Sequence, residues 1–75
     1  MKIDIENFWN TVEQTDKDAL HDVMYEANGT QPSDEEIKSL FMRLPSLIIG
    51  EAMSWGLSDT VVRDNIYEFI QSESE

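Results

Sequence analysis

The sequence of 75 residues lacks cysteine altogether and contains one histidine, three glycines and two prolines. The absence of cysteine excludes disulfide bonds and thiolate metal sites. The glycines are too far apart to form a phosphate-binding loop, and the carboxylates lack the spacing and glycine of a calcium-binding loop. His21 has no second base or activated nucleophile beside it, so a hydrogen-bonded surface histidine is the simpler interpretation. We therefore expect a non-enzymatic protein with no catalytic residues, cofactor or metal.

Long apolar runs and positive charge are also scarce. The longest aliphatic run, Leu47-Ile48-Ile49, is far shorter than the roughly 20 residues that span a bilayer, and no apolar segment of the secretory kind follows Met1. Five lysines and arginines oppose 16 aspartates and glutamates, which gives a formal charge of −11. This charge repels nucleic acids and anionic lipids. We expect a soluble, cytoplasmic protein that binds a basic protein and makes no direct contact with nucleic acid or membrane.

Apolar residues are present at helical spacing along most of the chain. Leucine, isoleucine, valine and phenylalanine number 19, enough for a small core. Three segments follow the i, i+3, i+4, i+7 pattern of an amphipathic helix: Ile5, Phe8, Trp9 and Val12; Leu20, Val23, Met24 and Ala27; and Ile37, Leu40, Phe41 and Leu44. Two further stripes comprise Leu44, Ile48, Ala52 and Trp55, and Val62, Ile66, Phe69 and Ile70.

Helix-capping residues, glycines and a proline divide these stripes into four or five helices. Ser33 with Glu36, and more weakly Thr15 with Asp18, resemble capping boxes at helix starts. Asn28-Gly29 and Gly56 are typical helix ends, Pro45 disfavours a continuous helix at Leu44, and Ser58 or Thr60 is the expected cap of the last helix. We predict an all-α fold, a compact bundle of four or five short amphipathic helices, with a single domain over residues 1–71 and a polar tail over 72–75.

Carboxylates are concentrated on the outward face of the second expected helix. At about 100° per residue, the side opposite its apolar stripe carries Asp18, Asp22, Tyr25 and Glu26. The i, i+4 pairs Asp18–Asp22 and Asp22–Glu26 each destabilise the helix by about 0.2–0.5 kcal/mol. Only Lys17 is near enough to offset this repulsion, and it lies toward one edge of the row. Asp64 and Glu68 extend the pattern on the last helix. The acids could simply keep a small protein soluble, or they could form a binding surface.

As a binding surface, the acidic row is suited to a basic groove. Carboxylates about 5–6 Å apart along a helix imitate the regular charges of a nucleic-acid backbone. In size, charge and helicity the chain resembles small acidic phage-encoded inhibitors of restriction and CRISPR enzymes, a resemblance of class without a shared motif. We expect a DNA-mimic-like inhibitor that occupies a nucleic-acid-binding surface through Asp18, Asp22 and Glu26, with Tyr25 as anchor and Asp64 and Glu68 as a second edge.

Aromatic and methionine side chains support an alternative. Trp9 directly follows Phe8, so one helix stripe cannot bury both at its centre, and Met53 lies toward the edge of its stripe. Tryptophan is enriched where binding energy is concentrated. The alternative is therefore a helical protein–protein interaction module or homodimer that docks through an apolar patch around Trp9, Met53 and Trp55, with the acids only solubilising.

A third hypothesis is a divergent helix-turn-helix regulator. Residues 52–63, from Ala52 through Gly56-Leu57-Ser58 to Arg63, resemble the middle of that motif, in which a small residue packs inside the first helix and a glycine makes the turn. The pattern departs from the motif because Thr60-Val61 falls one position early and Asn65 occupies a usually apolar place. Two aspartates beside a single arginine on the second helix oppose DNA binding. We expect two helices meeting at a glycine turn.

Overall fold

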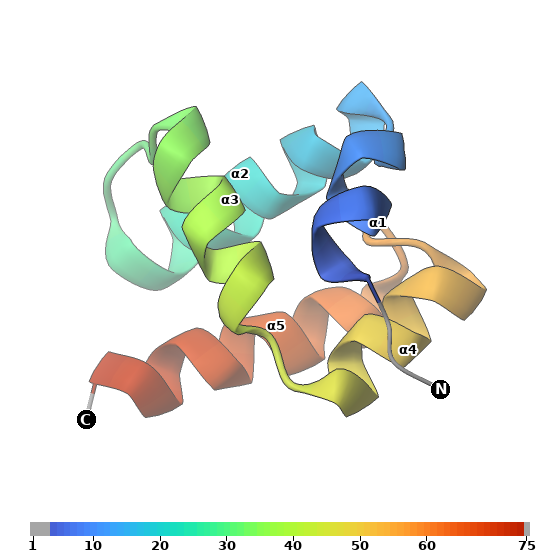
Figure 1. Ribbon diagram of the computed structural model, residues 1–75. Helices are drawn as coiled ribbons and strands as arrows, with labels where there is room; N and C mark the ends of the chain where they lie inside the picture. Colours follow the sequence, from blue (N-terminus) through green and yellow to red (C-terminus); the bar gives the residue numbers. More distant parts are fainter. Residues whose placement is uncertain (1–3, 75) are drawn as a thin grey trace.

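The computed structural model describes residues 4–74 and consists of five helices, with no strand among these residues (Figure 1). The helices are α1 (Ile5–Thr11), α2 (Gln14–Asn28), α3 (Asp34–Arg43), α4 (Ser46–Trp55) and α5 (Thr60–Ser74). The predicted all-α bundle of short helices is confirmed. No helix in this part of the chain combines the length and the apolar character needed to cross a membrane.

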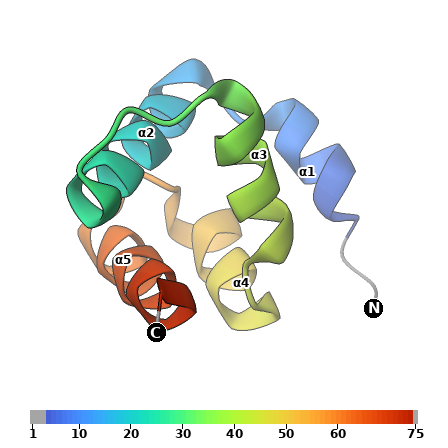
Figure 2. The same cartoon turned by 90° about the vertical axis from the view of Figure 1, so that its left-hand side faces the viewer.

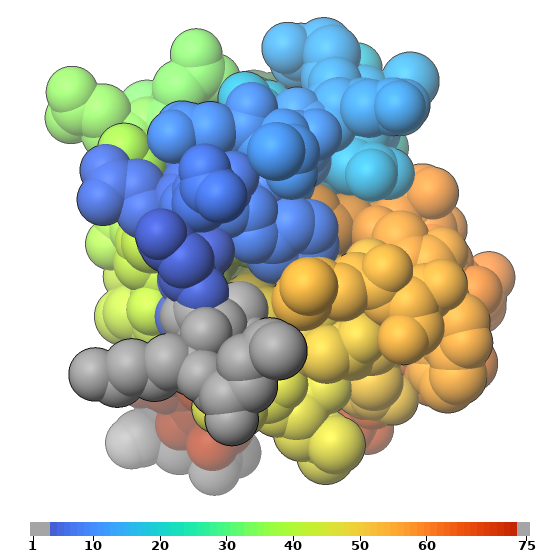
Figure 3. All heavy atoms as spheres, turned by 45° about the vertical axis from the view of Figure 1, so that its right-hand side comes forward, coloured from blue at the N-terminus to red at the C-terminus, as the bar shows by residue number. Residues whose placement is uncertain are grey.

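The five apolar stripes meet in one core. Helix α2 packs on α5, α3 packs on α1 and α2, and α4 packs on α5 (Figure 2). Phe41 of α3 is fully buried, and its ring lies 5.3 Å from that of Phe8 and 5.0 Å from that of Trp9, measured between centroids. On the face shown in Figure 3, α1 lies next to α4, and Ile5 and Phe8 of α1 pack against the core. The first and third stripes are therefore joined by aromatic contacts.

Most of the predicted helix boundaries are confirmed. Ser33 and Glu36 form the capping box of α3, in which each side chain accepts a hydrogen bond from the other residue's backbone N–H. Gly29 and Gly56 end α2 and α4 with φ of 77° and 92°, a region that glycine enters without steric cost. Pro45 separates α3 from α4, as expected from its effect on the preceding residue.

Two helix starts differ from the prediction. Helix α2 begins at Gln14 with Glu13 as N-cap, so Thr15 lies inside the helix and caps nothing. The cap of α5 is neither Ser58 nor Thr60 but Asp59, whose Oδ1 accepts hydrogen bonds from the N–H groups of residues 61 and 62.

Helix α5 continues to Ser74, through most of the segment expected as a polar tail at 72–75. The guanidinium of Arg43 donates two hydrogen bonds of 3.0 Å to Glu73, which ties the last turn of α5 to α3. The remaining residues of the predicted domain and tail, 1–3 and 75, lie outside the described part of the chain.

Candidate partner-binding surface

The outward face of α2 presents the predicted acidic row to solvent. Asp18, Asp22, Tyr25 and Glu26 are all exposed, with 47% of the surface of Tyr25 accessible. The row points outward because the opposite side of α2 is held in the core by Leu20, Val23 and Met24. Asp18 accepts a hydrogen bond of 3.0 Å from Gln14 one turn earlier. The four residues thus lie together along one helix, which we call the α2 acidic row.

Helix α5 brings Asp64 beside this row. Val23 and Glu26 of α2 line a hollow of about 150 Å³ together with Thr60, Arg63, Asp64 and Tyr67 of α5. Further along, Gln71 donates a hydrogen bond of 3.3 Å to the carbonyl of Ala27, so the two helices run in the same general direction. Glu26 and Asp64 therefore border the same hollow at the α2–α5 junction, with Arg63 beside them.

Glu68 lies one turn beyond Asp64 but borders a different hollow. It lines a groove of about 400 Å³ between α4 and α5, together with Glu51 of α4. The predicted second edge, Asp64 and Glu68, is therefore exposed along α5, with Asp64 on the α2 side and Glu68 on the α4 side.

Most lysine and arginine side chains within residues 4–74 contact groups outside the α2 acidic row. The Nζ atom of Lys17 lies 4.7 Å from the centroid of the Trp9 ring, and that of Lys38 lies 4.0 Å from Glu6 Oε1. Arg43 pairs with Glu73. Arg63 lines the α2–α5 hollow. Within residues 4–74, no lysine or arginine nitrogen lies within 4.0 Å of a carboxylate of Asp18, Asp22, Glu26, Asp64 or Glu68.

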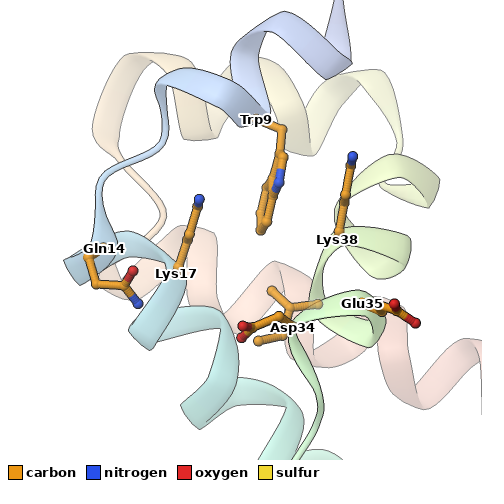
Figure 4. Close-up of a pocket in the computed structure, with 7 residues that line it drawn as sticks. Trp9, Gln14, Lys17, Asp34, Glu35 and Lys38 are labelled. Atoms are coloured by element: carbon orange, nitrogen blue, oxygen red, sulfur yellow. The ribbon is translucent and has the colours of Figure 1, made fainter.

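Trp9 belongs to the core, which corrects its assignment to an exposed patch. Only 9% of its surface is accessible, because its ring packs on Phe41 and is covered by Lys17. Figure 4 shows the indole between Lys17 and Lys38, with Asp34 and Glu35 on the opposite side of a hollow of about 280 Å³. The adjacency of Phe8 and Trp9 misled the prediction, since α3 supplies Phe41 as a partner for both rings.

The other members of the alternative patch are exposed on α4. Met53 and Trp55 have 56% and 58% of their surfaces accessible. They are two residues apart, which at 100° per residue places them on opposite flanks of the helix. Leu47 is more exposed, at 77%, and sequence reasoning missed it because it was taken only as part of an aliphatic run. A helical wheel would have separated Leu47 from the buried Ile48.

The α4–α5 segment forms two helices joined at a glycine turn, as predicted. At the position where a helix-turn-helix usually has an apolar residue, Asn65 donates a hydrogen bond of 3.0 Å to Glu51 of α4. The exposed side of α5 carries Asp64 and Glu68. A negatively charged reading helix is unfavourable next to phosphates. The geometry therefore gives no support to the helix-turn-helix hypothesis.

Two further groups have defined roles in the fold. His21 Nε2 lies 3.3 Å from Asp34 Oδ1, so the histidine bridges α2 to the start of α3. The hydrogen bond from Arg43 lowers the pKa of Glu73 and raises that of Arg43. Among residues 4–74, no three acidic or histidine side chains converge in a way that could hold a metal ion.

Comparison of the chain with protein-family models, with curated proteins and with solved structures finds no match.

Proposed function

We propose that this protein binds a basic, nucleic-acid-binding surface of a partner protein through the α2 acidic row and Asp64, and thereby inhibits the partner. One observation supports this proposal above the others. The carboxylates of the row are exposed, and no lysine or arginine nitrogen of residues 4–74 lies within 4.0 Å of them. Lys17, Lys38 and Arg43 are engaged elsewhere, and Arg63 lines the hollow beside Glu26 and Asp64 without an ion pair to either. Acids that served solubility alone would not need to be separated from the cations in this way.

The physical consequence is a negative field over this face of the molecule. Unpaired carboxylates on one helix face attract a basic groove at long range and accelerate association. Their spacing of about 5–6 Å along the helix is comparable to the distance between charges on a nucleic-acid strand. Tyr25, exposed within the row, supplies an aromatic contact that a phosphate backbone lacks. Binding of this kind blocks the groove without any chemical step.

The test begins with capture of basic proteins from a native lysate on the immobilised chain in 0.05 M salt, followed by elution at 0.5 M. A captured protein is then bound to its labelled DNA or RNA, and displacement by the free chain is followed by fluorescence anisotropy. Because screening shortens electrostatic interactions to a few ångströms at high salt, we expect displacement at 0.05 M and little at 0.5 M.

Charge reversal locates the surface. The variant Asp22→Lys/Glu26→Lys should lose displacement, and addition of Asp18→Lys should abolish what remains. The matched control, Glu13→Lys/Glu35→Lys, changes net charge by the same amount at exposed sites outside the row and should still displace the nucleic acid. Equal loss in both double variants, or full activity of the triple variant, would contradict the proposal, provided that circular dichroism shows intact helices.

A further inference from the structure

The groove between α4 and α5 combines apolar side chains with carboxylates. Its apolar part comprises Pro45, the N-cap residue of α4, Leu47 and Ile48 of α4, and Phe69 of α5. Glu51 and Glu68 lie beside them. Ile48 and Phe69 also pack in or against the core, whereas Leu47 is 77% exposed. A folded domain of this size thus leaves a large aliphatic side chain in water at the edge of a hollow of about 400 Å³.

The contacts across the groove show how it is built. Pro45 and Ile48, at the start of α4, line the same hollow as Phe69 and Ser72, near the end of α5, while Glu51 accepts a hydrogen bond from Asn65. The two helices are therefore antiparallel, and the groove follows the seam between them. Because both walls are helices anchored in the core by Ile49 and Ile66, the groove is a preformed feature.

The charges on the rim decide between occupants. Neither Glu51 nor Glu68 has a lysine or arginine nitrogen within 4.0 Å in the part of the chain that the structure describes. A second copy of this chain, which carries the same −11 charge, would bring like charges together, and a nucleic acid would be repelled. A cationic segment with an apolar side chain matches both the floor and the rim.

We propose that the α4–α5 groove receives an amphipathic basic segment of the protein partner, with an apolar side chain on Leu47, Ile48 and Phe69 and a lysine or arginine beside Glu51 and Glu68. This inference rests on the proposed function in that it takes the partner to be a basic protein. It adds a second contact on another face of α5, away from the α2 acidic row. The α2 acidic row would provide steering, and the groove would recognise a particular segment by its apolar anchor.

The experiment uses the full chain and two synthetic peptides of 12 residues. One peptide has leucines along one helical face and lysines elsewhere, and the other has serines in place of the leucines, so that their charges are equal. Affinities are measured by isothermal titration, and the binding site is located by NMR from the methyl groups of Leu47, Ile48 and, on the α2 side, Val23. We expect the leucine peptide to bind about tenfold tighter and to shift the methyl signals of Leu47 and Ile48.

Variants distinguish recognition of the peptide by the groove from its attraction to the negative charge of the whole chain. Leu47→Ser should remove the preference for the leucine peptide without loss of helicity, because the side chain is exposed. Glu51→Gln/Glu68→Gln should weaken the leucine peptide several-fold at low salt, since the glutamine at 51 can still accept from Asn65. The matched control, Asp22→Asn/Glu26→Gln, removes the same charge from the α2 acidic row and should have less than half of that effect.

Four results of the peptide experiment would overturn the inference. They are equal affinity for the two peptides, a preference that survives Leu47→Ser, methyl shifts at Val23 alone, and no binding of either peptide. A concentration-dependent dimer of the free chain that Leu47→Ser dissolves would assign the groove to a second copy instead. None of these results affects displacement of nucleic acid by the α2 acidic row, so failure of the groove and failure of the proposed function are distinguishable.

Discussion

The replacement Asp22→Asn should stabilise the free protein. Asp22 lies one turn from both Asp18 and Glu26, and within residues 4–74 no cation lies within 4.0 Å of any of the three. Each i, i+4 pair of like charges costs about 0.2–0.5 kcal/mol, so removal of two pairs should raise the free energy of unfolding by about 0.4–1 kcal/mol. Asparagine and aspartate have similar helix propensities, so the change isolates the charge.

The assay is urea unfolding followed by circular dichroism in 0.05 M and 0.5 M salt, together with thermal unfolding. For a domain of this size the gain corresponds to an increase of about 2–8 °C in Tm, and it should shrink at high salt because the repulsion is screened. Glu35→Gln is the control, since it removes the same charge from the first turn of α3, where the helix dipole favours an acid. Glu35→Gln should lower stability.

Two results would refute this reasoning. Unchanged or lower stability of Asp22→Asn would mean that the α2 acidic row is neutralised by other groups. A similar gain in Glu35→Gln would mean that relief of total net charge, rather than relief of the row, explains the effect.

Three other changes test how the helices are held together. Glu73→Gln should lower the free energy of unfolding by no more than about 1 kcal/mol, as for an exposed ion pair. Because Arg43 lowers the pKa of Glu73 in the folded state, this difference should be fully present above the ordinary pKa of 4.5 and should disappear as pH falls through the lowered pKa. A difference that does not depend on pH would contradict this account. Asp59→Ala should cost about 0.5–2 kcal/mol in urea unfolding, as for a lost cap, and an equal cost of Ser58→Ala would contradict the assignment of the cap. Phe41→Ala should cost about 3–5 kcal/mol, comparable to the whole stability of a small domain, so a persistent helical circular dichroism signal would contradict its central place in the core.

Local signals in the sequence were sufficient for the fold class and most helix boundaries. The i, i+3, i+4 stripes, the Ser33–Glu36 box and the glycine ends are determined by residues close in sequence, and they are found as predicted. Two caps were assigned to the wrong neighbour, because Glu13 and Asp59 occupy the positions expected for Thr15 and for Ser58 or Thr60. The end of α5 depends on a distant residue. The sequence of the last turn of α5 resembles a polar tail, but this turn is held against α3 by the hydrogen bonds from Arg43, 30 residues earlier, to Glu73. No short-range pattern could have indicated that contact.

The candidate surface was predictable to a similar extent. A helical wheel places the α2 acidic row on the solvent side, and the structure shows it there. The neighbourhood of each residue depends on helix packing, which the sequence did not reveal: Asp64 lies toward α2, Glu68 lies toward α4, and Trp9 is buried by α3. Leu47, 77% exposed, was missed because it was considered only as part of an aliphatic run and was not placed on a helical wheel.

The cost of the α2 acidic row links stability to binding. A small domain has only about 3–5 kcal/mol of stability, so about 0.4–1 kcal/mol of internal repulsion is a substantial fraction of it. A basic groove that places cations beside Asp18, Asp22 and Glu26 removes that repulsion, and a ligand that binds only the folded state adds stability in proportion to its affinity. Asp22→Asn should therefore unfold at a higher temperature than the natural chain when free, but gain less when a saturating basic partner is added. Acids that only confer solubility would show the first difference without the second, so thermal unfolding of both proteins with and without the partner separates the two explanations.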